Sequence, residues 1–252
     1  MIIFRDVVKG FGKKEVLRGF SLEVRDGETM AIIGYSGTGK SVSLKHIVGL
    51  LEPFTGEVEV DGKIVADLSR KELKELRSRI GYVFQFAALF DSMTVAENIA
   101  LGLRRQRMPE DEIRERITQS LALVDLAGSE ERYPIELSGG MRKRVGIARA
   151  IALRPKYILY DEPTTGLDPV TTAMMDVLMV RVKENLGVTG VAVTHDMKSA
   201  YTIADRIAML YEGRIRQVGT VDDIRNSDDP VVRQFIEGKP DASATAADTE
   251  LQ

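Results

Sequence analysis

The octapeptide GYSGTGKS at residues 34–41 has the residue types needed to hold phosphate groups. It matches the pattern G-x-x-x-x-G-K-[ST], and it follows an apolar run and precedes a helical pattern, as that motif requires. Its glycines let the backbone curl so that N–H groups face phosphate oxygens, beside the positive end of a helix. The frame of Gly-Lys-Ser disfavours the plain alternative, an ordinary glycine-rich turn. We expect nucleotide contacts from Gly34, Tyr35, Ser36, Gly37, Thr38, Gly39, Lys40, Ser41 and Val42.

Two carboxylates in the segment YILYDE could complete this chemistry. Lys40 would reach the β- and γ-phosphates, and the hydroxyl of Ser41 would bind Mg²⁺. Asp161, at the end of an apolar strand, can join the Mg²⁺ shell, while Glu162 can orient or deprotonate the attacking water. On its own, an Asp-Glu pair after a strand is more often the start of a loop. Together with the phosphate loop, it predicts phosphoryl transfer to water.

The two histidines of the chain receive different interpretations. His195 ends a buried strand in VAVTHD, and the carboxyl ends of strands in α/β sheets are where ligand sites form. We therefore expect His195 to contact the γ-phosphate, although a lone histidine is more often structural. His46 lies within the helix that follows the phosphate loop, and we interpret it as structural.

A second candidate anion site occurs at LSGGM, residues 137–141. Ser138 and the Gly139-Gly140 backbone can present N–H donors at the start of a helix. Two such helix ends, far apart in one chain, suggest a composite site in which two chains pack head to tail around two nucleotides. The basic cluster at residues 142–144 is interpreted as a solvated helix face, and the net charge disfavours its alternative use in binding nucleic acid.

The remaining pattern predicts strands and helices that could position these residues. Buried parallel strands are predicted by short apolar runs at residues 29–34, 80–84, 157–161 and 190–194. Half-exposed antiparallel strands are predicted by alternating runs at residues 2–8, 20–24 and 57–62.

Helical periodicity is expected in three places. The helix after Gly39 places Leu44, Ile47, Val48 and Leu51 on one face, and residues 109–124 place Ile113, Ile117, Leu121 and Val124 on one face. Residues 169–186 have Asp168 as N-cap, Pro169 in the first turn and Gly187 as a stop. Residues 94–135 look helical throughout, which predicts a helical subdomain, about 94–155, inserted in an α/β core.

Composition narrows the function classes. The chain has 252 residues, of which 44% are hydrophobic, and 35 basic against 38 acidic residues give a net charge of -3. That balance offers no general attraction to nucleic acid or anionic lipid. Cysteine is absent, so there is neither a disulfide framework nor a thiolate metal site. No apolar run approaches the roughly 18–20 residues that span a bilayer, so we expect a soluble chain whose membrane role comes through a partner.

The ordered motifs resemble those of ABC-type ATPases, over nearly the whole chain to residue 237. The resemblance implies a P-loop NTPase fold with a RecA-like mixed-sheet core, an antiparallel β subdomain and the inserted helical subdomain, in one domain of residues 1–237. It also implies ATP and Mg²⁺ as ligands. Residues 238–252 have few large apolar side chains, and we expect a disordered tail.

The same resemblance implies roles for three further residues. Phe11 falls where the family places an aromatic ring that stacks on adenine, and the alternative is a core or turn aromatic. Gln85 falls at the Q-loop glutamine, which contacts Mg²⁺ or the attacking water. Asp168 falls at the D-loop, which crosses the dimer interface, and it can also remain the N-cap of its own helix. Met141 departs from the family signature, which usually has glutamine there.

Within the family, three segments resemble the ATPase subunits of Mla/MCE-type phospholipid transporters. They are QFAALFDSMTVAENIALGLR, LSGGM and DPVVRQFIEG. This branch implies a homodimer bound to an integral membrane permease at the cytoplasmic face of the bacterial inner membrane, with an MCE-domain lipid carrier and, in some members, a small STAS-domain subunit. The tail after Glu237 is short, so a long arm reaching the neighbouring subunit is not expected.

Other functions within this superfamily remain to be weighed. The ATPase of an amino-acid or metal-ion importer would keep every catalytic assignment and change only the cargo. DNA-repair members carry coiled-coil or zinc insertions between the phosphate loop and the signature, and this interval has neither heptads nor cysteine. We expect part of residues 86–93 to receive a permease helix, and the alternative is that Leu89 and Phe90 pack inside the subdomain.

Overall fold

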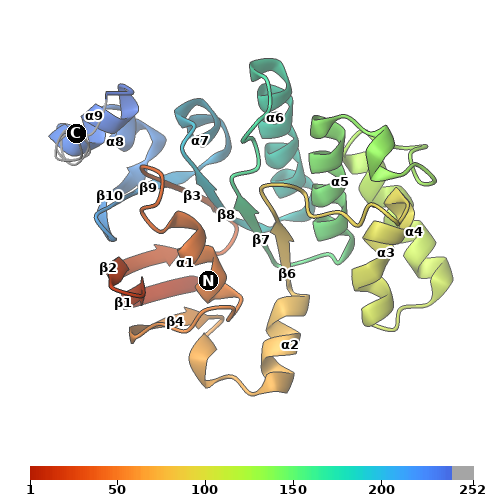
Figure 1. The fold of residues 1–252 in the computed structure, drawn as a ribbon, viewed down its shortest axis with the longest axis horizontal. Helices are drawn as coiled ribbons and strands as arrows, with labels where there is room; N and C mark the ends of the chain where they lie inside the picture. Colours follow the sequence, from red (N-terminus) through yellow and green to blue (C-terminus); the bar gives the residue numbers. More distant parts are fainter. Residues whose placement is uncertain (240–252) are drawn as a thin grey trace.

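The computed structural model describes residues 1–239 and contains two sheets (Figure 1). The larger sheet has the strand order β10-β9-β3-β8-β7-β6. Its strands are β3 (Thr29–Ile33), β6 (Ile80–Val83), β7 (Tyr157–Asp161), β8 (Thr189–Thr194), β9 (Arg206–Tyr211) and β10 (Arg214–Thr220). Neighbouring strands run parallel except at β10, which is antiparallel to β9. The predicted mixed-sheet α/β core is therefore confirmed. Every residue of β3 and β8 is buried, which explains their continuous apolar sequences.

The smaller sheet is antiparallel, with the order β2-β1-β4-β5, and confirms the predicted β subdomain. It consists of β1 (Ile2–Phe11), β2 (Lys14–Val24), β4 (Thr55–Val60) and β5 (Lys63–Ile64). Helix α1 (Lys40–Ile47) contacts β4 of this sheet and β7 and β8 of the larger one. One apolar cluster joins the two sheets through Leu44 and Ile47, so the helix that follows the phosphate loop is fixed from both sides.

Helix α1 is shorter than its apolar pattern predicts. It ends at Ile47, and Leu51 lies in the loop beyond it. Gly49 has a φ of 61°, and its N–H donates to the carbonyl of His46. A Cβ there would lie 2.7 Å from Leu73, so this left-handed turn favours glycine and ends the helix.

Three helices form a second lobe beside β6, on the right in Figure 1. They are α3 (Val95–Arg105), α4 (Glu110–Leu123) and α5 (Gly139–Ala152). The apolar face predicted for α4 is buried in one cluster with α3, α5 and part of the larger sheet. As predicted, residues 94–135 contain helices and no strand. The chain leaves the helical conformation after α4, where Asp125 and Gly128 adopt positive φ angles of 56° and 80°. Only a short 3-10 helix, Pro134–Glu136, precedes α5.

The face of the larger sheet opposite α1 carries α6 (Pro169–Leu186) and α7 (Met197–Ile203). Asp168 caps α6 and Gly187 ends it with a φ of 62°, both as predicted. The remaining helices are α2 (Arg70–Ser78), α8 (Val221–Arg225) and α9 (Pro230–Ile236). Within residues 1–239, no helix has the length and apolar character needed to cross a membrane. Of the tail predicted to be disordered, residues 240–252 lie outside the described part of the chain, and Gly238 and Lys239 close a turn after α9.

Candidate nucleotide site

The carboxyl ends of four neighbouring strands bring the predicted residues to one edge of the sheet. Gly34 follows β3, Gln85 comes two residues after β6, Asp161 ends β7 and His195 follows β8. Because β3, β8, β7 and β6 are consecutive in the sheet, these four loops are neighbours. This is the edge at which open α/β sheets bind ligands.

The phosphate loop adopts a conformation that depends on its glycines. Gly34, Gly37 and Gly39 have φ angles of 152°, 75° and 105°. A Cβ on Gly34 would lie 2.4 Å from the carbonyl oxygen of Leu210, and one on Gly39 would lie 2.7 Å from Val16. Side chains are therefore excluded here, and the backbone is free to approach a phosphate group closely.

Lys40 is oriented into this loop. Its ammonium donates to the carbonyls of Gly34 at 2.8 Å and Tyr35 at 3.0 Å, and the residue is only 4% exposed. Burial lowers the pKa of Lys40, while the charges of Glu162 and Asp161 oppose that shift. A buried cation between glycine-rich backbone and two carboxylates suits the phosphate chain of a nucleotide.

The other predicted loop residues divide by side-chain location. The Tyr35 ring packs against Phe235, with ring centroids 5.0 Å apart, and Val42 packs against the core between the sheets. These two residues can therefore offer a phosphate only their backbone. Ser36 and Gly37 are exposed, and the Thr38 hydroxyl donates to the carbonyl of Tyr35 at 2.8 Å.

The predicted magnesium ligands Ser41 and Asp161 already contact each other. The Ser41 hydroxyl donates to Oδ1 of Asp161 at 2.6 Å. Among residues 1–239, no group of three or more histidine, cysteine, aspartate or glutamate side chains could hold a metal ion by itself. A hydroxyl and one carboxylate fit Mg²⁺, which takes oxygen ligands and usually shares them with substrate phosphates and water. Gln85 is half-buried on the adjacent loop.

Tyr82 also contacts Asp161 and was missed by the sequence interpretation. Its hydroxyl donates to Oδ2 of Asp161 at 3.0 Å, and burial together with that carboxylate raises the pKa of Tyr82. The Tyr82 ring also stacks on Phe84, the first residue after β6, with centroids 4.5 Å apart. A tyrosine in a buried strand looks like core in a sequence, and only the pairing of β6 with β7 places it beside Asp161.

Glu162 and His195 come together beyond β7 and β8. Nδ1 of His195 lies 3.5 Å from Oε2 of Glu162, and their side chains are 51% and 18% exposed respectively. Glu162 has a φ of 48°, in the left-handed region, and its N–H donates to the carbonyl of Val193 at 3.0 Å. The Thr165 hydroxyl donates to Oε2 of Glu162 at 2.9 Å. A carboxylate held this way can accept a proton from water, and the imidazole beside it can contact a phosphate group.

The LSGGM segment lies apart from the phosphate loop of its own chain. Ser138 caps α5 and accepts from the Met141 N–H at 3.2 Å, and both Ser138 and Gly139 are exposed. Gly140 is buried, and a Cβ there would lie 2.7 Å from Thr171. In Figure 1, α5 stands on the other side of β6 and β7 from α1. The start of α5 is therefore open to a second molecule.

The positions of Asp168 and Phe11 are compatible with both roles considered for each residue in the sequence. Oδ1 of Asp168 accepts from the N–H groups of Val170 and Thr171, each at 3.0 Å, so the carboxylate caps α6 while remaining exposed. The Thr171 hydroxyl and these N–H groups lower the pKa of Asp168. Phe11 ends β1 and is 50% exposed, which leaves a ring face free for a base.

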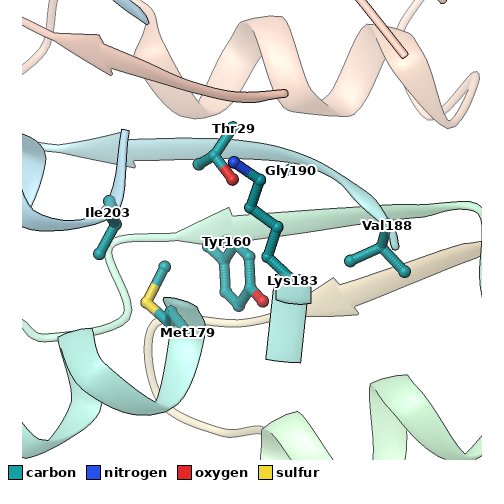
Figure 2. A pocket seen from close by; sticks show the side chains of 7 residues that line it. All are labelled: Thr29, Tyr160, Met179, Lys183, Val188, Gly190 and Ile203. Carbon is teal, nitrogen blue, oxygen red and sulfur yellow. The ribbon is translucent and has the colours of Figure 1, made fainter. Parts of the chain in front are cut away.

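His46 has no part in this edge of the sheet. It is buried in α1, where its Nδ1 lies 2.7 Å from the Val42 carbonyl oxygen, and burial lowers the pKa of His46. A separate hollow, shown in Figure 2, lies between α6 and the sheet. It includes Thr29 and Gly190 near the amino ends of β3 and β8, away from the loops described above.

The interpretation of residues 142–144 as a solvated basic face is wrong for Lys143. Arg142 is exposed, whereas the half-buried Lys143 ammonium donates to the carbonyls of Pro163 and Thr165, both at 2.8 Å. Further along α5, Arg149 donates to the carbonyls of Ala87 and Ala88 at 2.7 and 2.6 Å. No local sequence signal distinguishes these inward cations, because their carbonyl partners lie on distant segments.

Comparison with known proteins agrees with this geometry. The family model described as ABC transporter matches residues 17–165. The chain is 42% identical over 234 residues to the "Probable ribonucleotide transport ATP-binding protein mkl" of Mycobacterium tuberculosis, covering 92% of this chain and 65% of that protein, so it spans slightly less than two thirds of this relative. It is 44% identical over 259 residues to "Protein TRIGALACTOSYLDIACYLGLYCEROL 3, chloroplastic" of Arabidopsis thaliana, covering 96% of this chain and 74% of that protein. It is also 44% identical over 240 residues to the methionine import ATP-binding protein MetN of Carboxydothermus hydrogenoformans, covering 94% of this chain and 71% of that protein.

Solved structures are similar over most of the chain. The ATP-binding cassette MJ0796, in a dimeric post-hydrolysis state bound to ADP and Pi, matches with a TM-score of 0.79 and 35% identity, over 88% of this chain and 99% of that one. The cbiO1 protein of Clostridium perfringens, part of the ABC transporter complex cbiONQ, matches with a TM-score of 0.83 and 30% identity, over 93% and 94%.

Fold and site thus define a P-loop ATPase. The chain belongs to the ABC transporter family and is an ATP-binding subunit of that type. Its domain binds ATP with Mg²⁺ and hydrolyses ATP.

Proposed function

We propose that this chain powers phospholipid transport between the membranes of a bacterial envelope. The observation that carries this proposal is the segment from Gln85, QFAALFDSMTV, whose sequence resembles Mla/MCE-type ATPases and whose large aromatic side chains are exposed. Phe86 is 83% exposed and Phe90 is 56% exposed. The relative named for trigalactosyldiacylglycerol, a glycerolipid, supports the same cargo class.

The exposed segment fits a docking role. Ala87 is buried and Leu89 packs against the helical lobe, so the backbone is anchored while Phe86 and Phe90 face outward. We expect Phe90→Ala to uncouple ATP hydrolysis from the permease with little loss of stability. Leu89→Ala, the matched control, should instead lower the unfolding temperature. If Phe90→Ala retained full permease-stimulated ATPase activity, the docking role of this residue would be excluded.

Each residue of the site receives a role in hydrolysis. Lys40 and the loop N–H groups bind the phosphate chain, Glu162 accepts a proton from the attacking water, and His195 contacts the γ-phosphate. Ser41, Asp161 and Gln85 would hold Mg²⁺, which when bound neutralises charge on the β- and γ-phosphate oxygens. We expect Phe11 to stack on the adenine ring.

The arrangement is completed by a second copy of the chain. The exposed Ser138 and Gly139, with the backbone of Gly140, would contact the nucleotide held by the partner's phosphate loop, and Asp168 would lie at that interface. The dimeric structure of the MJ0796 cassette supports a homodimer. The head-to-tail arrangement rests on the separation of the two candidate anion sites within one chain. Ser138→Arg should then abolish activity, and an active, stably monomeric variant would exclude the composite site.

The further partners follow from the family branch. We expect an integral membrane permease and an MCE-domain lipid carrier, with a small STAS-domain subunit as in some members of this branch, and this chain bound peripherally at the cytoplasmic face of the inner membrane. The cbiO1 structure, described as part of an ABC transporter complex, supports association with membrane components.

The base assignment is tested by Glu162→Gln. ATP binding should persist, because the phosphate loop is unchanged, while turnover should fall by about 10²-fold or more. Near-normal turnover would show that another group activates water. Equilibrium binding of a fluorescent ATP analogue and single-turnover hydrolysis measure the two effects separately.

A second candidate function is the import of an amino acid, favoured by the 44% identity to a methionine import ATP-binding protein. Purification from native membranes in mild detergent distinguishes the two functions. A permease with an MCE-domain protein and bound phospholipid would support lipid transport. A permease with a solute-binding protein for amino acids would replace that proposal with the importer.

A further inference from the structure

The turn that carries Glu162 is attached to the helix that begins at the LSGGM segment. We name residues 162–167 the catalytic turn. Its backbone is held internally by the N–H of Thr165 donating to the carbonyl of Glu162 at 3.3 Å, and that of Leu167 to Thr164 at 3.1 Å. The left-handed conformation of Glu162 costs about 1 kcal/mol or more for a side chain with a Cβ, so surrounding contacts must maintain it.

One external contact comes from Lys143, in the second turn of α5. Its ammonium donates to the carbonyls of Pro163 and Thr165, at 2.8 Å each, and so ties together the peptide group before Thr164 and the one after Thr165. The side chain is half-buried, and burial lowers the pKa of Lys143 while the charge of Glu162 opposes that shift. An ammonium that has exchanged water for two carbonyls is a fixed support rather than a mobile surface charge.

The support leads directly to the carboxylate of Glu162. Lys143 fixes the backbone of Thr165, and the Thr165 hydroxyl donates to Oε2 of Glu162 at 2.9 Å. The same oxygen lies 3.5 Å from Nδ1 of His195. A shift of the turn would therefore move the carboxylate relative to both His195 and the attacking water. The phosphate loop would be unaffected, because Lys40 makes its own contacts with Gly34 and Tyr35.

We propose that Lys143 is the positioning residue for Glu162, linking helix α5 to the catalytic turn. This inference rests on the proposed role of Glu162 as the base. In the proposed head-to-tail dimer it has a further consequence, because Ser138 at the start of α5 faces the partner's nucleotide. Helix α5 of one chain would then contact the nucleotide bound by the partner. Through Lys143, the same helix would hold Glu162 of its own chain, which acts on the nucleotide in the second composite site.

The test compares Lys143→Met with Lys143→Arg in the full chain, purified with its partner subunits. Lys143→Met should lower kcat about 10- to 100-fold, the loss typical of a misplaced catalytic group, with KM for ATP within about twofold. Lys143→Arg, which keeps a cation and N–H donors, should recover most of kcat. The control is Lys74→Met, at an exposed lysine of α2, which should leave both constants unchanged. If Lys143→Met does not fold, Lys143→Gln keeps an N–H donor and is measured in the same way.

A double variant separates positioning from general stabilisation. If Lys143 acts through Glu162, adding Lys143→Met to Glu162→Gln should lower single-turnover hydrolysis no further. Normal kcat in Lys143→Met, a loss explained by the unfolded fraction in thermal melts, or an additional loss in the double variant would each overturn the inference. Normal turnover in Glu162→Gln alone would overturn the base assignment and this inference with it. An inactive Glu162→Gln beside a normal Lys143→Met would overturn only the role of Lys143.

Discussion

Asp176 is a buried acid whose replacement should make the chain more stable at neutral pH. It lies on α6, is 4% exposed, and accepts a hydrogen bond on Oδ2 from the Ser199 hydroxyl of α7 at 3.0 Å. Its Oδ1 is buried and has no partner among the described residues. Burial raises the pKa of Asp176 to about 6, the Ser199 hydroxyl opposes that shift, and the charge of Asp196 adds to it.

The pH dependence follows from the direction of this shift. Below about pH 4 the folded and unfolded chains both carry the proton on Asp176, so the residue has no charge to bury. Between pH 4 and 6 the unfolded chain releases the proton while the folded chain keeps it, so stability falls as pH rises. Above pH 6 the full cost is present. A pKa difference of about 2 units corresponds to roughly 3 kcal/mol.

Asp176→Asn removes the charge and therefore removes this dependence. The new amide can still accept from Ser199 through its oxygen, but its NH₂ group takes the place of an unpartnered oxygen and costs about 1–2 kcal/mol. We expect the variant to gain about 1–2 kcal/mol at pH 8, or a few degrees in unfolding temperature for a domain of this size. At pH 4 the advantage should reverse, because only the unpaired amide remains.

The assay is thermal and urea unfolding of both proteins at several pH values from 4 to 8. Other acids titrate in this range, but they are present in both wild type and Asp176→Asn. The difference between the two free energies of unfolding therefore reports on Asp176. Asp228→Asn, at an exposed acid, is the control for the removal of one negative charge. Parallel stability curves for wild type and Asp176→Asn would refute the reasoning, since they would show that Asp176 does not become charged in this window.

Three other substitutions test contacts of the site. Tyr82→Phe removes a donor to Asp161 and should raise the Mg²⁺ concentration for half-maximal ATPase activity about tenfold, with unchanged thermal stability; an unchanged Mg²⁺ titration would contradict this role. Arg149→Met removes the donors to the carbonyls of Ala87 and Ala88, two residues with positive φ angles of 59° and 48°. Limited proteolysis should therefore cut residues 86–93 faster in this variant, while nucleotide affinity is retained. Equal cleavage rates would show that the segment is held by other contacts. Phe11→Ala should weaken ATP binding by about 1–3 kcal/mol and leave kcat unchanged, as measured by equilibrium titration; unchanged affinity would place adenine elsewhere.

The sequence predicted most of what lies at the carboxyl ends of the strands. Parallel strands buried on both faces are nearly continuous apolar runs, so β3, β7 and β8 were recognisable, and the residues following them were identified with them. The caps of α6 at Asp168 and Gly187 were equally local and equally predictable. The end of α1 was misplaced because the apolar pattern continues beyond Gly49, where the backbone turns.

The contacts that support the site could not be predicted in the same way. Tyr82 on β6 contacts Asp161 on the neighbouring strand β7, and Lys143 on α5 contacts Pro163 in the turn after β7. Each depends on which segments the fold brings together, and neither residue type is unusual in its local context. A lysine among three basic residues resembles a solvated surface until the position of its carbonyl partners is known.

The positive φ of Glu162 has a consequence for how this protein can change. Glycine adopts that backbone conformation without penalty, so Glu162→Gly should relax the turn even as it removes the proposed base. Selection for thermal stability alone would then favour a substitution at position 162 that leaves the enzyme inactive. A library screened only for heat resistance should enrich glycine or asparagine there, whereas a screen that demands turnover should retain glutamate.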